Sequence, residues 1–369
     1  MNSMKNSVDP KVVEKIASKF GLSKSLIEIH LNALEIAQQL QKYDKTLILF
    51  GGTAAQFYIP SNLQRTSLDV DLITNYSYKK IDEVMEGFFP QIGLKPIKGK
   101  KLKTTYGTRF SVPVELNFST AGFSREPCVK VEIVSKTKEQ FNKTNMKKSI
   151  LHDLDMGEFI LLSREDIFSK KLITLDIDNL GIHKDSGRDL PLNMSKQISD
   201  IYRLYLLFDK SDFQNVGKNL FQQLENEIKN CNSDSKPDSC IENICSIMRS
   251  LSLVETTKSD NESKILTEGY KSLRNFYLPK DAKMDFNELG SLGWTFEHLL
   301  KSILLDNKNV NNTKILEHYD IKEKYKTNDK TERVKVLEEL SVYKDIPKPY
   351  KNRPLYSLFF EKDLMQGLK

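Results

Sequence analysis

The sequence predicts an α+β fold, in which a small mixed β-sheet is flanked by helices and followed by a helical C-terminal domain. Short apolar, β-rich runs stand among helical patterns in the first half, whereas the pattern is helical from about Leu206 onward. At 369 residues the chain is too long for one ordinary domain, and 39% hydrophobic residues are enough to build a core in each of two domains. We therefore expect an N-terminal helical segment at 1–44 that packs on the sheet, the sheet domain at 45–207 and a helical domain at 208–369.

Two helices open the chain. Asp9 and Pro10 are a typical cap and first-turn pair for a helix that ends near Gly21, and Ser23 can cap a second helix that runs to about Lys42. The second helix is apolar on all sides, which disfavours a helix that reads a DNA groove. We expect both helices to support the sheet.

A buried strand is predicted next, at 45–50, and it stops at Gly51 and Gly52. A short helix from Thr53 to Tyr58 follows, with Pro60 after it. Glycines allow a phosphate to approach the backbone closely, and a helix N-terminus attracts anions. We therefore expect the backbone N–H groups and the Thr53 hydroxyl to face an anion.

Asp69 and Asp71 lie two residues apart in a second β-rich run, so both carboxylates lie on one face of a strand. Leu68, Val70 and Leu72 then point to the other face. Mg²⁺ binds one or two carboxylates and completes its coordination with water and substrate phosphate, and a second ion can activate an attacking oxygen. This strand predicts a magnesium site beside the glycine turn.

The rest of the first half completes the sheet. Ser77 begins an amphipathic helix that ends at Pro90, and three β-rich runs follow at 108–118, 128–135 and 158–162. The expected sheet has about five strands and no Rossmann alternation. A third carboxylate beside the aspartate strand would hold a second ion or deprotonate a hydroxyl, and Glu132 and Glu115 are the two candidates.

Read together, Gly51-Gly52-Thr53-Ala54 and Arg65-Thr66-Ser67-Leu68-Asp69-Val70-Asp71 resemble the AbiEii (MenT-like) nucleotidyltransferase toxins of the DNA polymerase β superfamily. The signature of that family is a GG-T-A turn followed by an R-x-S-x-D-x-D strand. Lys171 and Asp200 match two later helical motifs, so the resemblance covers roughly residues 10–208. Ser199 stands where the family has an arginine, and Arg203 where it has a second aspartate.

The resemblance implies a nucleotidyltransferase that moves a nucleoside monophosphate from a nucleoside triphosphate to a hydroxyl, which can be the 3′ end of tRNA or another RNA. It implies Mg²⁺, with Mn²⁺ as an alternative, and an antitoxin partner. Asp69, Asp71 and Glu132 would bind the metal, and Lys171 and Asp200 would complete the catalytic set. Gly51, Gly52, Thr53, Arg65, Ser67 and Lys171 would bind the nucleotide. The separation from Lys171 favours Glu132 over Glu115.

Two other functions fit the same residues: transfer to a small molecule or to a protein hydroxyl, and a nucleotide-binding module without catalysis. The retention of Thr53, Asp69, Asp71 and Lys171 together argues against the second. The acceptor is expected to be selected in the helical second half, where Trp294, Phe296, Tyr319 and Tyr325 could stack on bases, although core packing is the more frequent use of such residues.

Composition limits the remaining functions. The net charge of +6 does not by itself indicate nucleic acid. Local clusters could contact phosphate, and they are Lys95, Lys98, Lys100, Lys101 and Lys103; Lys143, Lys147 and Lys148; and Lys344, Lys348, Lys351 and Arg353. The four cysteines and five histidines lack zinc-site or nucleophile spacing. No apolar run of membrane-spanning length or signal peptide is found, so we expect a cytoplasmic protein with no membrane contact.

Overall fold

The computed structural model describes residues 9–92, 97–98, 107–118, 127–136, 143–147, 157–181, 189–254, 260–309, 315–317 and 320. The chain divides into two compact units. The first comprises Met1–Ile167 and Asn275–Ala282, and the second comprises Phe168–Arg274 and Lys283–Lys369. The first unit therefore contains the sheet, and the division falls earlier than the sequence boundary expected at 207.

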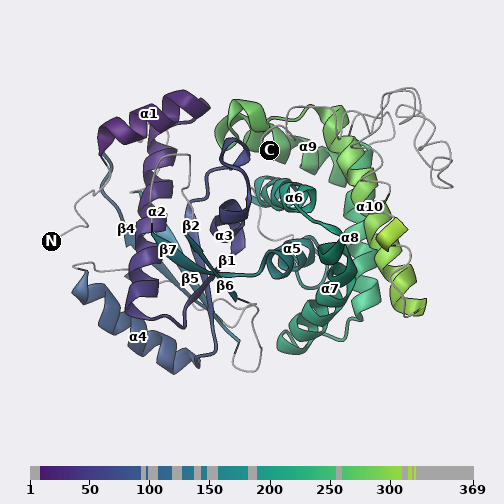
Figure 1. Ribbon diagram of the computed structural model, residues 1–369, viewed down its shortest axis with the longest axis horizontal. Coiled ribbons are helices and arrows are strands. Elements are labelled where there is room, and N and C mark those ends of the chain that lie inside the picture. Colours follow the sequence, from purple (N-terminus) through teal and green to yellow (C-terminus); the bar gives the residue numbers. More distant parts are fainter. Residues whose placement is uncertain are drawn as a thin grey trace. The chain divides into compact units, whose positions relative to one another are not determined.

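The described residues form a seven-stranded mixed sheet in the order β3-β4-β5-β2-β1-β7-β6 (Figure 1). Its central strand β2 pairs antiparallel with β1 and parallel with β5, and β1 pairs parallel with β7. The strands are β1 Ile48–Phe50, β2 Asp69–Thr74, β3 Ile97–Lys98, β4 Gly107–Pro113, β5 Cys128–Ser135, β6 Lys143–Lys147 and β7 Glu158–Leu162. The predicted α+β fold is confirmed.

The sheet has two more strands than the five expected, and both are its edges. Edge strand β3 pairs with β4, and edge strand β6 pairs with β7. In addition, β4 ends at Pro113, so the strand predicted at 108–118 is shorter than expected. Edge strands often carry lysine, which protects an open edge from pairing with other chains but hides the strand pattern in the sequence.

The helices of the first unit are α1 Pro10–Phe20, α2 Lys24–Tyr43, α3 Gly51–Tyr58 and α4 Tyr78–Gln91, with short 3₁₀ turns η1 Ser61–Leu63 and η3 Lys280–Ala282. The Asp9 carboxylate caps α1 by accepting the Lys11 N–H at 2.9 Å, and Gly21 ends it with φ +66°. Ser23 precedes α2 but makes no side-chain cap, because its hydroxyl bonds the Ser25 hydroxyl at 2.9 Å.

Helix α2 supports the sheet, as the sequence predicts. It packs against β2, β5 and β7 (Figure 1). The Gln41 amide bonds both backbone groups of Ile160, donating at 2.7 Å and accepting at 3.0 Å. The buried Glu28 carboxylate accepts the backbone N–H groups of Asn117, at 2.7 Å, and Phe118, at 3.2 Å. Helix α2 therefore fixes the segment that follows β4 as well as the centre of the sheet.

Helix α4 covers β4 and β5. Its five predicted core residues are all buried: Ile81, Val84, Met85, Phe88 and Phe89. The rings of Phe89 and Phe110 are 5.5 Å apart. Because Phe110 and Arg109 are adjacent on β4, their side chains lie on opposite faces, so α4 lies on the face away from Arg109.

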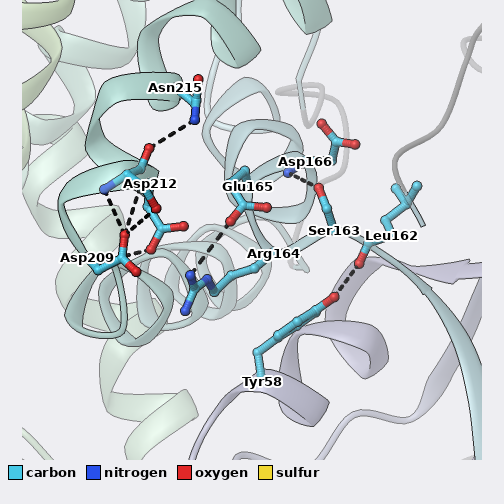
Figure 2. Close-up of polar contacts among 10 residues, drawn as sticks. Tyr58, Leu162, Ser163, Arg164, Glu165, Asp166, Asp209, Asp212 and Asn215 are labelled. Atoms are coloured by element: carbon cyan, nitrogen blue, oxygen red, sulfur yellow. Dashed lines mark hydrogen bonds and ion pairs between the residues drawn. The ribbon is translucent and has the colours of Figure 1, made fainter. Parts of the chain in front are cut away.

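The end of β7 is tied to α3 and leads into helix α5, Arg164–Ile173 (Figure 2). The Tyr58 hydroxyl donates to the Leu162 carbonyl at 2.7 Å, and burial raises the pKa of Tyr58 to about 12. The Ser163 hydroxyl accepts the Asp166 N–H at 3.2 Å, while the Arg164 guanidinium lies 3.7 Å from the Glu165 carboxylate. These contacts fix where α5 begins.

The second unit is helical in its described part. Its helices, besides the end of α5, are α6 Leu190–Leu206, α7 Lys210–Asn230, α8 Pro237–Ser252, α9 Asn261–Phe276, whose last two residues belong to the first unit, and α10 Phe286–Asn309. Helices α7, α8 and α10 pack on one another. Asp209 and Asp212 form a reciprocal capping box at the start of α7, also drawn in Figure 2. None of the described helices could cross a membrane.

Of the four aromatic residues considered for base stacking, Phe296 belongs to the core. It is fully buried, and its ring centroid lies 5.1 Å from that of Tyr205. The side chain of Trp294 and residues Tyr319 and Tyr325 lie outside the described residues, as do most of the lysine clusters: Lys95, Lys100, Lys101, Lys103, Lys148, Lys344, Lys348, Lys351 and Arg353.

Candidate active site

The two aspartates lie on one face of β2. Asp69 and Asp71 are partly exposed, whereas Val70 and Leu72 between and beside them are fully buried. This alternation is the one that the two-residue period of a strand predicts. The two carboxylates therefore reach solvent from the same side of the central strand.

The glycine turn lies against Asp71. Phe50 is the register partner of Asp71 in the antiparallel pair of β1 and β2, so the turn that follows Phe50 begins beside this aspartate. Gly51 has φ +74°, and a Cβ atom there would overlap the Asp71 carboxylate. Only glycine avoids both the left-handed strain and this overlap. The acidic strand and the turn thus form one site.

The second glycine makes room for Arg65 and Ser67. A Cβ atom on Gly52 would lie 2.6 Å from an Arg65 guanidinium nitrogen and 2.9 Å from the Ser67 hydroxyl oxygen. Both side chains are buried, and Arg65 also donates to the Thr66 carbonyl at 3.0 Å. The segment before the aspartates therefore packs directly on the glycine turn.

The Thr53 hydroxyl makes a different contact from the one expected. Its hydroxyl is buried and donates to the Asp69 backbone carbonyl at 2.6 Å, rather than facing an anion. The reason is geometric: Thr53 lies in the first turn of α3, where its side chain meets the neighbouring strand β2. In this structure the hydroxyl fastens the turn to the aspartate strand.

The two candidates for the third carboxylate are placed differently. Glu132 on β5 is the register partner of Asp71, so the two side chains lie next to each other on one face. Its carboxylate accepts a hydrogen bond from the Arg109 Nε at 2.6 Å. Glu115 lies beyond the end of β4 and is exposed. This geometry favours Glu132 over Glu115, as the separation from Lys171 in the sequence did.

His30 on α2 belongs to the surroundings of the site, and the sequence reasoning missed it. Its Nδ1 lies 2.6 Å from the Ser67 carbonyl and 3.3 Å from the Ser67 backbone nitrogen. Because a carbonyl oxygen can only accept, we assign the proton to Nδ1, which then donates in the shorter contact. Burial is the main reason that the pKa of His30 falls to about 4; the bond to Ser67 opposes this shift, and the Arg65 charge adds to it. A lone histidine in an apolar helix was the available signal, since a buried polar group needs a partner.

Lys171 and Asp200 form an ion pair in the second unit, with 2.9 Å between the ammonium nitrogen and a carboxylate oxygen. Both side chains are buried, at 5% and 0% exposed. The two residues that depart from the family pattern also meet, because the Arg203 guanidinium donates to the Ser199 hydroxyl one turn earlier. The neighbouring Lys170 pairs instead with Glu227 at 3.1 Å.

The donor set of β2 fits a divalent cation. Two carboxylates from one strand are what Mg²⁺ usually takes from a protein, the remaining positions being filled by water and substrate phosphate. Among the residues that the structure describes, no three of the acidic, histidine or cysteine type gather as a complete metal cage. Glu132 is held by Arg109 instead, so the fit concerns Asp69 and Asp71.

Among the described residues, the cysteines belong to no group of three or more candidate metal ligands. All four are free thiols. Burial raises the pKa of Cys240 and of Cys245 to about 12, so neither is a thiolate near neutral pH.

Comparison with known proteins agrees with the motifs. The family model described as nucleotidyl transferase AbiEii toxin of type IV toxin–antitoxin systems matches residues 35–302. No curated protein matches the chain as a relative.

Among solved structures, the chain is similar to a candidate nucleotidyltransferase from H. pylori, with 15% identity and a TM-score of 0.32 over 68% of this chain and 99% of that one. It is also similar to JHP933 from Helicobacter pylori, with 16% identity and a TM-score of 0.30 over 68% and 96% of the two chains. An antigenic nucleotidyltransferase-like protein from Paracoccidioides brasiliensis has 16% identity and a TM-score of 0.32 over 57% and 97%.

Proposed function

The chain belongs to the AbiEii nucleotidyltransferase toxin family, and from this premise we propose that it transfers a nucleoside monophosphate from a nucleoside triphosphate to the 3′ hydroxyl of an RNA, with tRNA as the expected acceptor. One observation carries the proposal. The Asp71 carboxylate lies against the Gly51 turn, with Asp69 on the same face and Glu132 beside it. An anion-binding turn and a cation-binding acidic pair in contact are what phosphoryl transfer requires.

The reaction forms a bond between the acceptor oxygen and the α-phosphorus and breaks the bond from that phosphorus to the β-phosphate, so pyrophosphate leaves. A bound Mg²⁺, or Mn²⁺ in its place, supplies neutralisation of phosphate charge and activation of the hydroxyl. Asp69 and Asp71 would hold it. The backbone N–H groups at the start of α3 would bind phosphate oxygens, because they have no partner within the helix.

Glu132 would accept the proton of the acceptor hydroxyl at its carboxylate. It adjoins Asp71 in the sheet, which supports this assignment. For Lys171 and Asp200 we propose that the lysine neutralises charge on the triphosphate and that the aspartate holds the lysine in position. Thr53, Arg65 and Ser67 would keep the turn and the aspartate strand in register for the nucleotide.

Radiolabelled transfer tests the proposal. The protein is incubated with each α-labelled nucleoside triphosphate, Mg²⁺ and total tRNA, and the RNA is separated on a gel. We expect label on RNA, none of it after chelation of the divalent ion, and a loss of at least about 100-fold in the Asp71→Asn variant. Absence of label on every RNA would refute the RNA acceptor.

Matched carboxylate variants test the third carboxylate. Glu132→Gln is expected to lower the transfer rate about 100-fold, whereas Glu115→Gln leaves it unchanged because Glu115 is exposed beyond the strand. The opposite ranking would reassign the role to Glu115.

The acceptor alternatives remain separable. Transfer to a small molecule or to a protein hydroxyl would give label outside the RNA fraction, and a non-catalytic module would bind the triphosphate in calorimetry without transferring it. The family description also supports a cognate antitoxin, for which a neighbouring reading frame that relieves growth arrest in co-expression is the expected finding.

A further inference from the structure

A row of side chains crosses three strands on the face that carries the aspartates. Arg109 on β4 is the register partner of Glu132 on β5, and Glu132 is the register partner of Asp71 on β2. Register partners on adjacent strands point to the same face of a sheet. The row therefore runs from the glycine turn through Asp71 and Glu132 to Arg109.

Arg109 is placed to meet a ligand. Its guanidinium contacts the Glu132 carboxylate through both Nε and Nη2, yet the arginine side chain is 40% exposed. Helix α4 covers the opposite face of β4, where Phe110 meets Phe89. The arginine thus projects from the same open face as the aspartates.

A second cation lies beside it. Lys130 on β5 is two residues before Glu132, so it points to the same face, and its register partner on β2 is Asp69. Lys130 is exposed. Each aspartate therefore has a β5 neighbour on the side away from the glycine turn.

The position of the two cations indicates which substrate they would meet. Adjacent strands lie about 4.8 Å apart, so the backbone of Arg109 is about 10 Å from that of Asp71 and farther still from the turn. The triphosphate would be bound where the N–H groups of α3 begin, next to Asp71. Arg109, at the far end of the row, and Lys130, on the side of β2 away from the glycine turn, are therefore better placed for the molecule that brings the attacking hydroxyl.

We propose that Arg109 and Lys130 form the acceptor side of the active site and bind phosphates of the RNA strand near its 3′ end. The inference rests on the proposed RNA acceptor. It assigns the glycine turn to the nucleotide and the β4–β5 portion of the face to the acceptor. Planar guanidinium groups bind phosphate in bidentate fashion, so a phosphate can replace the Glu132 carboxylate on Arg109.

The test measures binding without turnover. Fluorescence anisotropy of a labelled single-stranded 3′-terminal RNA gives the Kd at several salt concentrations for the wild type and for the Arg109→Gln/Lys130→Gln variant. Each phosphate contact contributes a slope of about 0.7 in log Kd against log salt for a single strand. Loss of two contacts therefore lowers the slope by about 1.4, and the ratio of variant to wild-type Kd falls about sevenfold between 50 and 200 mM salt.

The control removes the same charge elsewhere in the first unit. Lys80 on α4 and Arg164 on α5 also have nearby glutamates, at 3.6 and 3.7 Å, and Lys80→Gln/Arg164→Gln is expected to keep the wild-type slope. Arg109→Lys/Lys130→Arg retains both charges and should keep most of the slope. Calorimetric affinity for the triphosphate should be unchanged in every variant.

The outcomes separate this inference from the proposed function. A wild type that labels RNA, with a salt slope equal to that of the Arg109→Gln/Lys130→Gln variant, overturns the inference alone. So does a variant that loses triphosphate affinity while keeping the slope. A wild type that neither binds nor labels RNA overturns both, whereas the loss of slope confined to the β4–β5 variant supports the acceptor assignment.

Discussion

Replacing Gly51 with alanine tests the contact on which the site depends. The added methyl carbon would overlap an Asp71 carboxylate oxygen and lie 2.8 Å from the carboxylate carbon. An ordinary carbon–carbon contact is about 3.5 Å or more. Because Gly51 is held as the first residue of α3, directly after β1, we expect the aspartate side chain to give way by about 1 Å.

Two costs follow, and they affect different measurements. The left-handed backbone, φ +74°, costs an alanine about 1–2 kcal/mol of folding free energy. The displaced carboxylate affects catalysis, since a misplacement of about 1 Å can cost roughly 100-fold in rate. We therefore predict a melting temperature lowered by a few degrees and a transfer rate lowered about 100-fold.

Gly21→Ala is a matched control. Gly21 also has a left-handed φ, +66°, but the three atoms nearest to its Cβ would all belong to the Lys280 side chain, the first at 3.0 Å, and this side chain can move aside. The control should lose the same stability and keep its transfer rate. If Gly51→Ala transfers nucleotide as fast as Gly21→Ala, Asp71 does not depend on the turn and the reasoning fails.

Two further predictions concern buried groups. The unfolded chain protonates His30 near pH 6.5 and the folded chain only near 4, so the unfolded state binds more protons in this window and stability falls as pH falls. In His30→Asn the amide can still donate to Ser67 but does not titrate. Between pH 7 and pH 5 the free energy of unfolding in urea should therefore fall by about 2 kcal/mol less in this variant than in the wild type. An equal fall in both proteins would contradict a buried neutral histidine. Lys171→Met leaves Asp200 without its lysine and should cost about 3–5 kcal/mol, whereas Lys170→Met should cost about 1. The double variant Lys171→Met/Asp200→Leu should be more stable than Lys171→Met but should still fail to transfer nucleotide. Full transfer activity in the double variant would show that Lys171 is not a catalytic residue.

Local patterns predicted most of the elements of the first unit. The Asp9-Pro10 pair and Gly21 bounded α1, and apolar spacing identified the buried face of α4, because caps and periodicity act within a few residues. The alternation of β2 was equally readable. The edge strands were not: β6 reads Lys-Thr-Asn-Met-Lys and becomes a strand only by pairing with β7. Its pattern is typical of an exposed segment.

The sequence named candidate site residues, but it did not give the contacts that these residues make. Thr53 lay in the right turn, yet only the fold reveals that its hydroxyl is used by the Asp69 carbonyl. His30 and Arg109 had no motif to mark them, since their contacts arise from α2 meeting Ser67 and from the register of β4 with β5. Such pairings join distant parts of the sequence, and no local pattern encodes them.

The contacts give the two motifs a common physical reason. Gly51 accommodates Asp71, Gly52 accommodates Arg65 and Ser67, and Thr53 binds the carbonyl of Asp69. Three consecutive residues, 51–53, are thus each matched to the acidic strand or to the segment just before it, and a side chain at Gly51 would displace the Asp71 carboxylate. The glycines therefore serve the carboxylates first: they let an acidic side chain stand against a helix N-terminus, so that a bridging cation and a phosphate could occupy the same small region.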